Sequence, residues 1–228
     1  MAESISPERL RVGLLVPVNN TTMAGELAAW LPPGSTVEVR RIPRGKGLLT
    51  AATIPAYRDA ALALARDFAD PAFDIVAYGC TAASFIAGPE LDADLRERLQ
   101  QVTGRPVVTT AQSMVDALQA ERARRITVVT PYLEAVNTQL IAYLAAFGIE
   151  TASFASFFAP DTDALGRITA AEVAGLVRAT HDAGNDAVFI ACSQLPTFAI
   201  VDPLRLAFER PVWSSIRATA WQVLRSRR

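Results

Sequence analysis

Two cysteines, Cys80 and Cys192, are the side chains in this chain best suited to covalent or proton-transfer chemistry. Each follows an apolar run, 73–78 or 187–191, and so stands where a buried strand is predicted to end. In open α/β sheets, ligands bind beyond the carboxyl ends of the strands. The amides of a following helix would lower the pKa of a thiol there and make it a better nucleophile or base. A single cysteine in such a place is usually structural, but two in equivalent places predict a shared functional role.

The spacing around the cysteines indicates an internal duplication. Cys80 stands 63 residues after Pro17. Cys192 stands 61 residues after Pro131, and both prolines end a predicted strand. An Arg-Pro-Val triplet then follows each cysteine. Features repeated in the same order predict two copies of one structural unit, and a pseudo-twofold axis between the copies would place the cysteines on opposite walls of one cleft.

The order of the predicted elements is typical of an α/β protein. Strands alternate with helices, the pattern of parallel sheets covered by helices on both faces. We therefore predict two similar Rossmann-like (flavodoxin-like) lobes with the active site in the cleft between them. The first lobe is expected to span 11–113, joined by a C-terminal helix at 214–226, and the second to span 114–213. Strands are expected at 11–17, 37–42, 73–78, 106–108, 125–130, 150–154, 187–191 and 211–213, and helices at 23–30, 54–69, 90–101, 133–147 and 170–183.

Hydrogen-bonding side chains accompany the cysteines at the predicted cleft. Four of them, at 19–22, end the first strand, and a helix cap needs only one. The matching turn of the second half holds a tyrosine, whose hydroxyl could equally well bind a ligand or support the fold. Other polar residues directly follow each cysteine. The candidate ligand-binding residues are Asn19, Asn20, Thr21, Thr81, Tyr132, Ser193 and Gln194.

Composition and charge exclude several other classes of protein. The net charge of −1 gives no reason to expect a nucleic acid or a membrane surface as partner. No apolar run reaches the roughly 18 residues that span a bilayer. Residues 1–11 lack the apolar segment of a signal peptide, so we expect a cytoplasmic protein with free thiols.

Other catalytic and cofactor motifs are absent from the sequence. The single histidine, His181, lies in a charged helical stretch, so Ser-His-Asp and Cys-His catalysis would lack a base. No spacing of cysteine and histidine fits zinc, and no phosphate-binding glycine loop follows a strand. The sequence thus predicts neither a metal nor another cofactor.

Four segments resemble the aspartate/glutamate racemase superfamily, and within it the branch of maleate cis-trans isomerases and arylmalonate decarboxylases. They are 15–23 (LVPVNNTTM), 78–88 (YGCTAASFIAG), 128–132 (VVTPY) and 191–196 (ACSQLP). The likeness extends over nearly the whole chain. It implies a duplicated two-lobed fold that uses one cysteine from each lobe and no cofactor.

Within this branch, the first cysteine position separates the two activities. Decarboxylases are similar but carry glycine at the position of Cys80. Maleate isomerases keep both cysteines, together with residues that match Asn20 and Tyr132. Their asparagine that contacts a substrate carboxylate is matched here by Asp161. An ionised aspartate would repel a dicarboxylate unless it points away or Thr162 takes its place.

The residues and the resemblance support two mechanisms on a small carboxylate substrate. In the first, the Cys80 thiolate adds to maleate, hydrogen bonds stabilise the enediolate, and Cys192 protonates or orients from the opposite wall. In the second, one thiolate removes the α-proton of an amino acid or another α-substituted acid, and the other thiol returns a proton. Decarboxylation of the arylmalonate type is a further alternative. A binding protein of periplasmic type would need an export signal, and self-association into a homo-oligomer is left open.

Cationic side chains after the second strand complete the candidate site. A loop at this place could cover the ligand and offset its negative charge, or it could be an ordinary solvated loop. These side chains are Arg40, Arg41, Arg44 and Lys46.

Overall fold

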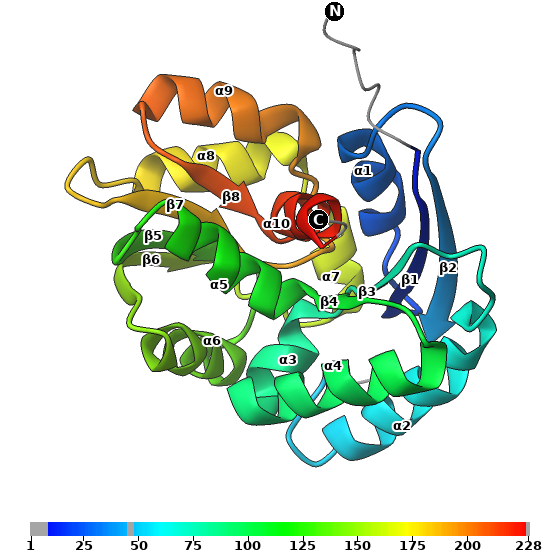
Figure 1. Ribbon diagram of the computed structural model, residues 1–228. Helices are drawn as coiled ribbons and strands as arrows, with labels where there is room; N and C mark the ends of the chain where they lie inside the picture. The colour runs from blue at the N-terminus through cyan, green and yellow to red at the C-terminus, as the bar shows by residue number, and fades with distance from the viewer. Residues whose placement is uncertain (1–8, 45–47, 227–228) are drawn as a thin grey trace, which may run out of the picture.

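Two four-stranded parallel sheets form the framework of the protein (Figure 1). The structure is a computed structural model and describes residues 9–44 and 48–226. The strand orders are β2-β1-β3-β4 and β6-β5-β7-β8, so the second sheet repeats the first. This confirms the predicted α/β fold with two similar lobes. The strands are β1 (Arg11–Pro17), β2 (Thr36–Ile42), β3 (Ile75–Tyr78), β4 (Val107–Thr109), β5 (Arg125–Thr130), β6 (Glu150–Ser156), β7 (Ala187–Ile190) and β8 (Val212–Ser214).

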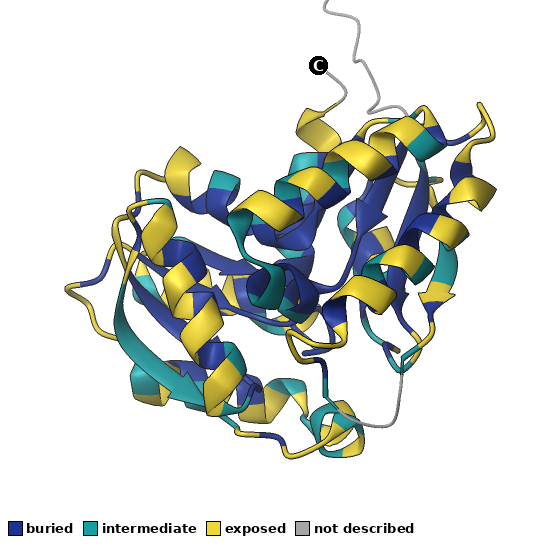
Figure 2. Ribbon diagram, turned by 90° about the horizontal axis from the view of Figure 1, so that it is seen from below, coloured by how far each residue is buried: buried dark blue, intermediate teal, exposed yellow. Residues whose placement is uncertain are grey.

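Helices cover both sheets, and the residues on their inward sides are buried while those on their outer sides are exposed (Figure 2). In the part of the chain that the structure describes, no helix is long and apolar enough to cross a membrane. A short 3-10 helix at Arg66–Phe68 extends α2. The α-helices are α1 (Met23–Trp30), α2 (Ile54–Ala65), α3 (Thr81–Ala87), α4 (Pro89–Thr103), α5 (Thr110–Ala120), α6 (Glu134–Ala146), α7 (Thr162–Arg167), α8 (Ala170–Thr180), α9 (Phe198–Phe208) and α10 (Ser215–Arg225).

The inner strands of each sheet end at the cleft between the lobes. β1 and β3 pair in parallel, as do β5 and β7, and the residues of β3 and β7 are all buried. Burial on both faces explains why these strands are continuous apolar runs in the sequence. Their carboxyl ends bring the loops that follow Pro17, Tyr78, Thr130 and Ile190 to the space between the lobes.

The last helix of each half packs against the other half. Five residues of α5 belong to the hydrophobic core around β5 and β7. Conversely, Ile216, Ala220 and Val223 of α10 belong to the core around β1. The two helices also pack on each other, and the hydroxyl groups of Thr110 and Thr219 lie 3.1 Å apart between them. The predicted boundary at 113 thus falls inside α5, and the division into lobes remains our proposal.

Four helices were not predicted from the sequence. α3 has no polar stretch between itself and the preceding strand, and α7 is short with no buried residue. α9 contains Pro203, which cannot donate a backbone hydrogen bond and normally argues against a helix interior. α5 follows β4 without a loop, so no turn marks its beginning. Helices without terminal signals or clear periodicity escape sequence analysis.

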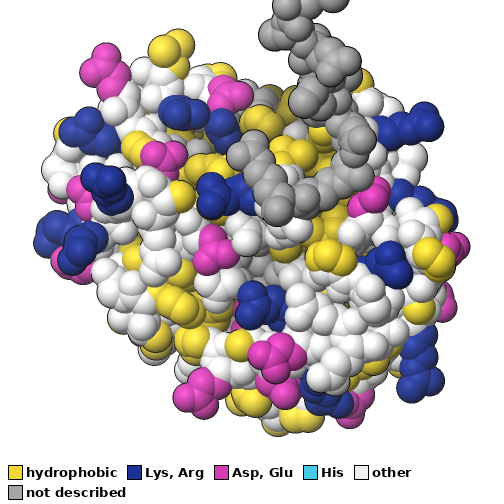
Figure 3. All heavy atoms as spheres, in the orientation of Figure 1, with side chains coloured by type: hydrophobic (Ala, Val, Ile, Leu, Met, Phe, Trp, Pro, Cys, Tyr) yellow, Lys and Arg dark blue, Asp and Glu magenta, His cyan; other side chains and the backbone are white. Residues whose placement is uncertain are grey.

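Charged side chains of both signs are interspersed on the face shown in Figure 3. This agrees with the near-equal numbers of basic and acidic residues, 22 and 23, in the whole sequence. A mixed surface gives no extended field of one sign on this face.

Candidate active site

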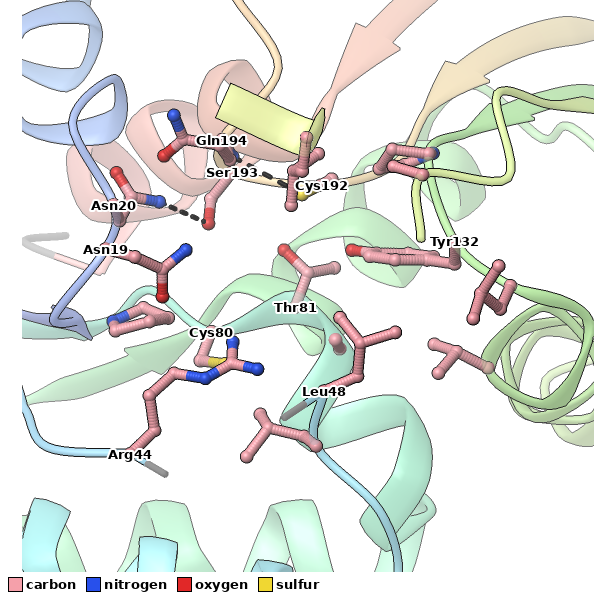
Figure 4. Close-up of a pocket in the computed structure, with 18 of the residues that line it drawn as sticks. Asn19, Asn20, Arg44, Leu48, Cys80, Thr81, Tyr132, Cys192, Ser193 and Gln194 are labelled. Carbon is pink, nitrogen blue, oxygen red and sulfur yellow. Dashed lines mark hydrogen bonds between the residues drawn. The ribbon is translucent and has the colours of Figure 1, made fainter. Parts of the chain in front are cut away.

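Both cysteines line one pocket between the lobes (Figure 4). Cys80 is the N-cap residue of α3, two residues after the end of β3, and Cys192 stands two residues after the end of β7. The two side chains are buried free thiols. The structure therefore brings the two predicted reactive groups together from equivalent strand ends. Other predicted site residues also line this pocket: Asn19, Asn20, Thr81, Tyr132, Asp161, Ser193 and Gln194.

Unusual backbone requirements fix the turns at the cysteines. A Cβ atom at Gly79 would lie 2.5 Å from the sulfur of Met23 and 2.9 Å from a methyl group of Val16, so no larger residue fits there without movement. Cys192 has a φ of 103°, in the region that favours glycine. Such a conformation costs about 1–3 kcal/mol and persists only where the surroundings hold it. The close packing at Gly79 and the unusual backbone conformation at Cys192 thus determine where the two cysteines lie.

Three buried polar atoms in the pocket lack a hydrogen bond of normal geometry among the described residues, although the Tyr132 hydroxyl lies close enough to Thr81 and Cys192 to interact with both. The three atoms are Oδ1 of Asn19, Oγ1 of Thr81 and the hydroxyl of Tyr132. In Figure 4 the hydroxyl groups of Thr81 and Tyr132 point toward the same space between the cysteines. A buried polar atom without a partner costs about 1–3 kcal/mol, and native proteins leave few of them. Their concentration here indicates a site that a polar ligand completes.

Other predicted binding residues are used instead to join the lobes. Asn20 accepts hydrogen bonds from the amides of Thr22 and Met23, and its Nδ2 donates to Ser193 Oγ at 3.1 Å. Ser193 Oγ in turn donates to the carbonyl of Gly79 at 2.7 Å. Each polar atom of these two side chains thus has at least one partner within the protein.

Thr21 and Gln194 form a second connection across the cleft. The Thr21 amide donates to Gln194 Oε1 at 2.9 Å, and Gln194 Nε2 donates to Thr21 Oγ1 at 3.0 Å. Thr21 is not one of the residues that line the pocket. Sequence reasoning placed it among the ligand contacts because it could not distinguish a residue that binds the ligand from one that joins the walls.

Asp161 lies at the edge of the pocket with its carboxylate directed to its own helix. It is the N-cap residue of α7 and accepts a hydrogen bond from the amide of Ala164 at 2.7 Å. The hydrogen bond holds the charge near a helix N-terminus, where it is favoured. Thr162 begins α7 but does not line the pocket, so its position does not replace a carboxylate-binding asparagine.

Burial raises the pKa of both thiols, contrary to the effect expected from helix amides alone. For Cys80, burial outweighs the Tyr57 hydroxyl, the amide of Ala83 and the charge of Arg44, which all lower the pKa. For Cys192, burial raises the pKa to about 11, although the amide of Gln194 and the hydroxyl of Tyr132 lower it. The loss of water around a buried thiolate is the larger effect. The resting thiols are therefore protonated at neutral pH.

The cationic side chains predicted to follow the second strand have different roles, and two of them, Arg40 and Arg41, lie within β2 itself. Arg40 forms ion pairs with Glu38 and Asp67 outside the pocket. Arg41 donates a hydrogen bond to the carbonyl of Asn20 at 2.6 Å. Arg44 lines the pocket, whereas Lys46 lies outside the described residues. Of the described members of this group, Arg44 alone is placed to meet a ligand.

One buried neighbour of Cys80 could not be identified from a sequence motif. Tyr57 of α2 is buried and lowers the pKa of Cys80 through a hydrogen bond, but nothing in the sequence of α2 distinguishes it from a core tyrosine.

His181 lies away from the pocket, where its ring stacks on Phe208 at 3.8 Å between centroids. Among residues 9–44 and 48–226, no group of His, Cys, Asp and Glu side chains could hold a metal ion.

Comparison with known proteins agrees with this geometry. A family model described as arylmalonate decarboxylase matches residues 12–227. The chain belongs to the arylmalonate decarboxylase family. This confirms the resemblance drawn from the four sequence segments.

Relatives of this family member include named enzymes and solved structures. The maleate isomerase of Geobacillus stearothermophilus is 26% identical over 231 residues, which cover 96% of this chain and 92% of the relative. The structure of the maleate isomerase Iso from Pseudomonas putida S16 has a TM-score of 0.88 at 25% identity, covering 96% of this chain and 93% of its own. A Nocardia farcinica maleate cis-trans isomerase, a cysteine-to-serine mutant with a covalently bound succinylcysteine intermediate, has a TM-score of 0.84 at 25% identity and covers 96% and 93%.

Proposed function

We propose that this protein is a cis-trans isomerase that converts maleate, or a close cis-enedioate, to the trans isomer. The observation that carries the proposal is the pair of cysteines from equivalent strand ends in one pocket, together with three buried polar atoms that lack a hydrogen bond of normal geometry. The relatives named maleate isomerase support it, and so does the succinylcysteine in a protein of the same fold. Racemisation, the alternative, has no comparable support among these relatives.

The reaction begins at Cys80. The thiol first loses its proton to water, and the thiolate then adds to one alkene carbon. The π electron pair moves onto the carboxylate of the other alkene carbon, and an enediolate with a rotatable carbon–carbon bond forms. The hydroxyl groups of Thr81 and Tyr132 face this space and can donate hydrogen bonds to the charge, and Nδ2 of Asn19, which also lines the pocket, can donate a further one. Such preorganised donors are worth several kcal/mol in a site shielded from water.

The second cysteine completes the reaction from the opposite wall. With a pKa raised to about 11 by burial, Cys192 keeps its proton at neutral pH and can donate it to the carbon next to the adduct. The product of this step is a succinyl group on Cys80. After rotation, the Cys192 thiolate removes the proton again, the electron pair re-forms the alkene, and Cys80 leaves as thiolate to give the trans acid.

Proton NMR in D₂O tests the proposal directly. The enzyme should convert the vinylic signal of maleate into that of fumarate. An α-substituted acid such as aspartate should keep its α-proton. The Cys80→Ser variant, checked for folding, serves as the control for contaminating activity. Deuteration of the α-carbon of aspartate without any conversion of maleate would instead identify a racemase.

A further inference from the structure

The pocket has an apolar wall for which maleate offers little contact. Its members are partly exposed aliphatic side chains from both lobes. Maleate presents two carboxylates and only two C–H groups. Bound here, maleate would either leave these side chains in contact with water or place a carboxylate against them. A carboxylate in apolar contact loses favourable hydration free energy. The apolar wall consists of Leu48, Ile86, Leu133, Val136 and Leu165.

Polar groups also line the pocket. In Figure 4 the amides of Asn19 and Asn20 and the guanidinium of Arg44 lie on the side of Cys80, while Tyr132 stands opposite. Among the described residues that line the pocket, Arg44 is the only cation. This side is suited to a carboxylate, whereas the apolar wall is suited to a hydrocarbon group.

We propose that the substrate is a maleate with an apolar substituent on one alkene carbon, a 2-alkyl- or 2-arylmaleate. The inference rests on the proposed isomerase function and specifies its substrate class. The substituent would contact Leu133, Val136 and Leu165, and a carboxylate would lie near Asn19 and Arg44. Contact with the wall removes apolar surface of both enzyme and substrate from water.

The chemistry remains balanced with this substrate. The Cys80 thiolate adds to the unsubstituted carbon, where it meets less steric hindrance. The π electron pair moves onto the carboxylate of the substituted carbon. Cys192 protonates the substituted carbon, and rotation takes place about the former double bond. The Cys192 thiolate then removes the proton, the alkene re-forms and the Cys80 thiolate leaves, which gives the substituted fumarate with no oxidant or reductant.

A substrate series tests the proposal on the intact enzyme. We would measure kcat/KM for maleate, 2-methylmaleate, 2-ethylmaleate and 2-phenylmaleate by NMR. The transfer free energy of one methylene group predicts a gain of about fourfold for each added methyl or methylene that the wall buries. A preference for maleate over all three substituted acids would overturn the proposal but leave the isomerase function intact. Conversion of none of the four would instead refute the proposed function.

Two substitutions on the same helix test the role of the wall. Val136→Ser, within the wall, should reduce the ratio of kcat/KM for 2-ethylmaleate to that for maleate by several-fold. Ile141→Ser, at an exposed position of α6 outside the pocket, should leave this ratio unchanged. An unchanged ratio in a folded Val136→Ser enzyme would refute selection by the wall. Should that variant fail to fold, inhibition of the unaltered enzyme decides: 2-ethylsuccinate must inhibit at several-fold lower concentration than succinate.

Discussion

The two thiols differ in the groups that act on them, and this difference separates their roles. The charge of Arg44 and the hydroxyl of Tyr57 favour the thiolate of Cys80. Cys192 has no cation among the groups that shift its pKa, and a charged Cys80 raises that pKa further. In a coupled pair, one thiolate suppresses the ionisation of the other. We therefore assign the nucleophile to Cys80 and the acid to Cys192.

Serine substitutions test this assignment. Cys80→Ser should reduce kcat by about 10³-fold or more, because a hydroxyl group without a base cannot replace a thiolate nucleophile. Cys192→Ser should lose about 10²–10⁴-fold, the usual contribution of general acid–base catalysis. It should also accumulate an adduct of substrate mass on Cys80, detected by intact-protein mass spectrometry. A Cys80→Ser enzyme with normal turnover would contradict a catalytic role for that residue.

The raised pKa values also predict the pH dependence of the reaction. With the pKa of Cys80 above its ordinary value, the thiolate fraction rises tenfold for each pH unit through the neutral range. Log kcat/KM should therefore increase with a slope of about one from pH 7 to about pH 8, while Cys192, with a pKa of about 11, stays protonated. Steady-state rates in overlapping buffers measure the profile. A plateau that begins below pH 8 would show that the Cys80 pKa is lowered instead.

Sequence patterns predicted the two reactive cysteines, but not which polar residues face the pocket and which form hydrogen bonds between the lobes. Strand ends and repeat spacing sufficed to place Cys80 and Cys192 in one cleft. Sequence analysis named both Asn19 and Asn20 and favoured Asn20 through the family resemblance, yet of the two only Asn19 has an unpartnered side-chain oxygen in the pocket. The difference depends on Ser193, which lies 173 residues from Asn20 along the chain, and no local pattern records such a contact.

At the scale of elements, the turn from β3 to α3 depends on a close approach of the backbone to α1. Gly79→Ala should lower the free energy of unfolding by about 1–3 kcal/mol, the cost of overpacking a core. It should also reduce activity, because Cys80 is the next residue. Gly175→Ala is the matched control: nothing lies within 4 Å of the added Cβ, and a helical alanine should raise stability by about 0.5–1 kcal/mol. Urea unfolding of both variants measures the changes, and equal stabilities would contradict the packing argument.

Elements with a strong pattern were predicted well, and those without one were missed. The observed β1 and α1 have the bounds expected from the sequence, because an apolar run and a proline-glycine stop define them. Predicted helices 90–101 and 133–147 differ from α4 and α6 by one or two residues at each end. α9 was not predicted because Pro203 disfavours a helix in the local sequence. Packing of Val201 and Leu204 in the core stabilises the helix nevertheless.

At the scale of the molecule, α5 and α10 each pack against the core of the other half, so the stability of each half depends on the other. A chain cut between α5 and β5 would leave α5 without the core it joins and the core around β1 without α10. We expect the fragments 1–122 and 123–228 to be unfolded alone, and to regain helical circular dichroism and isomerase activity when refolded together. A cooperative unfolding transition in either isolated fragment would contradict this dependence.

The absence of buried residues in α7 has a consequence for the timing of the reaction. The lobes are joined by α5 and α10 and by the hydrogen bonds of Asn20 and Thr21, so opening them as a hinge would break a large shared core. α7 has no fully buried side chain, and only its partly buried Leu165 packs against the core, so local opening of this segment costs less free energy than opening the lobes. Asp161 and Leu165 on this segment border the pocket. We therefore expect the exchange of substrate and product to follow the microsecond-to-millisecond motion of one short helix, with the cysteines held still throughout the catalytic cycle.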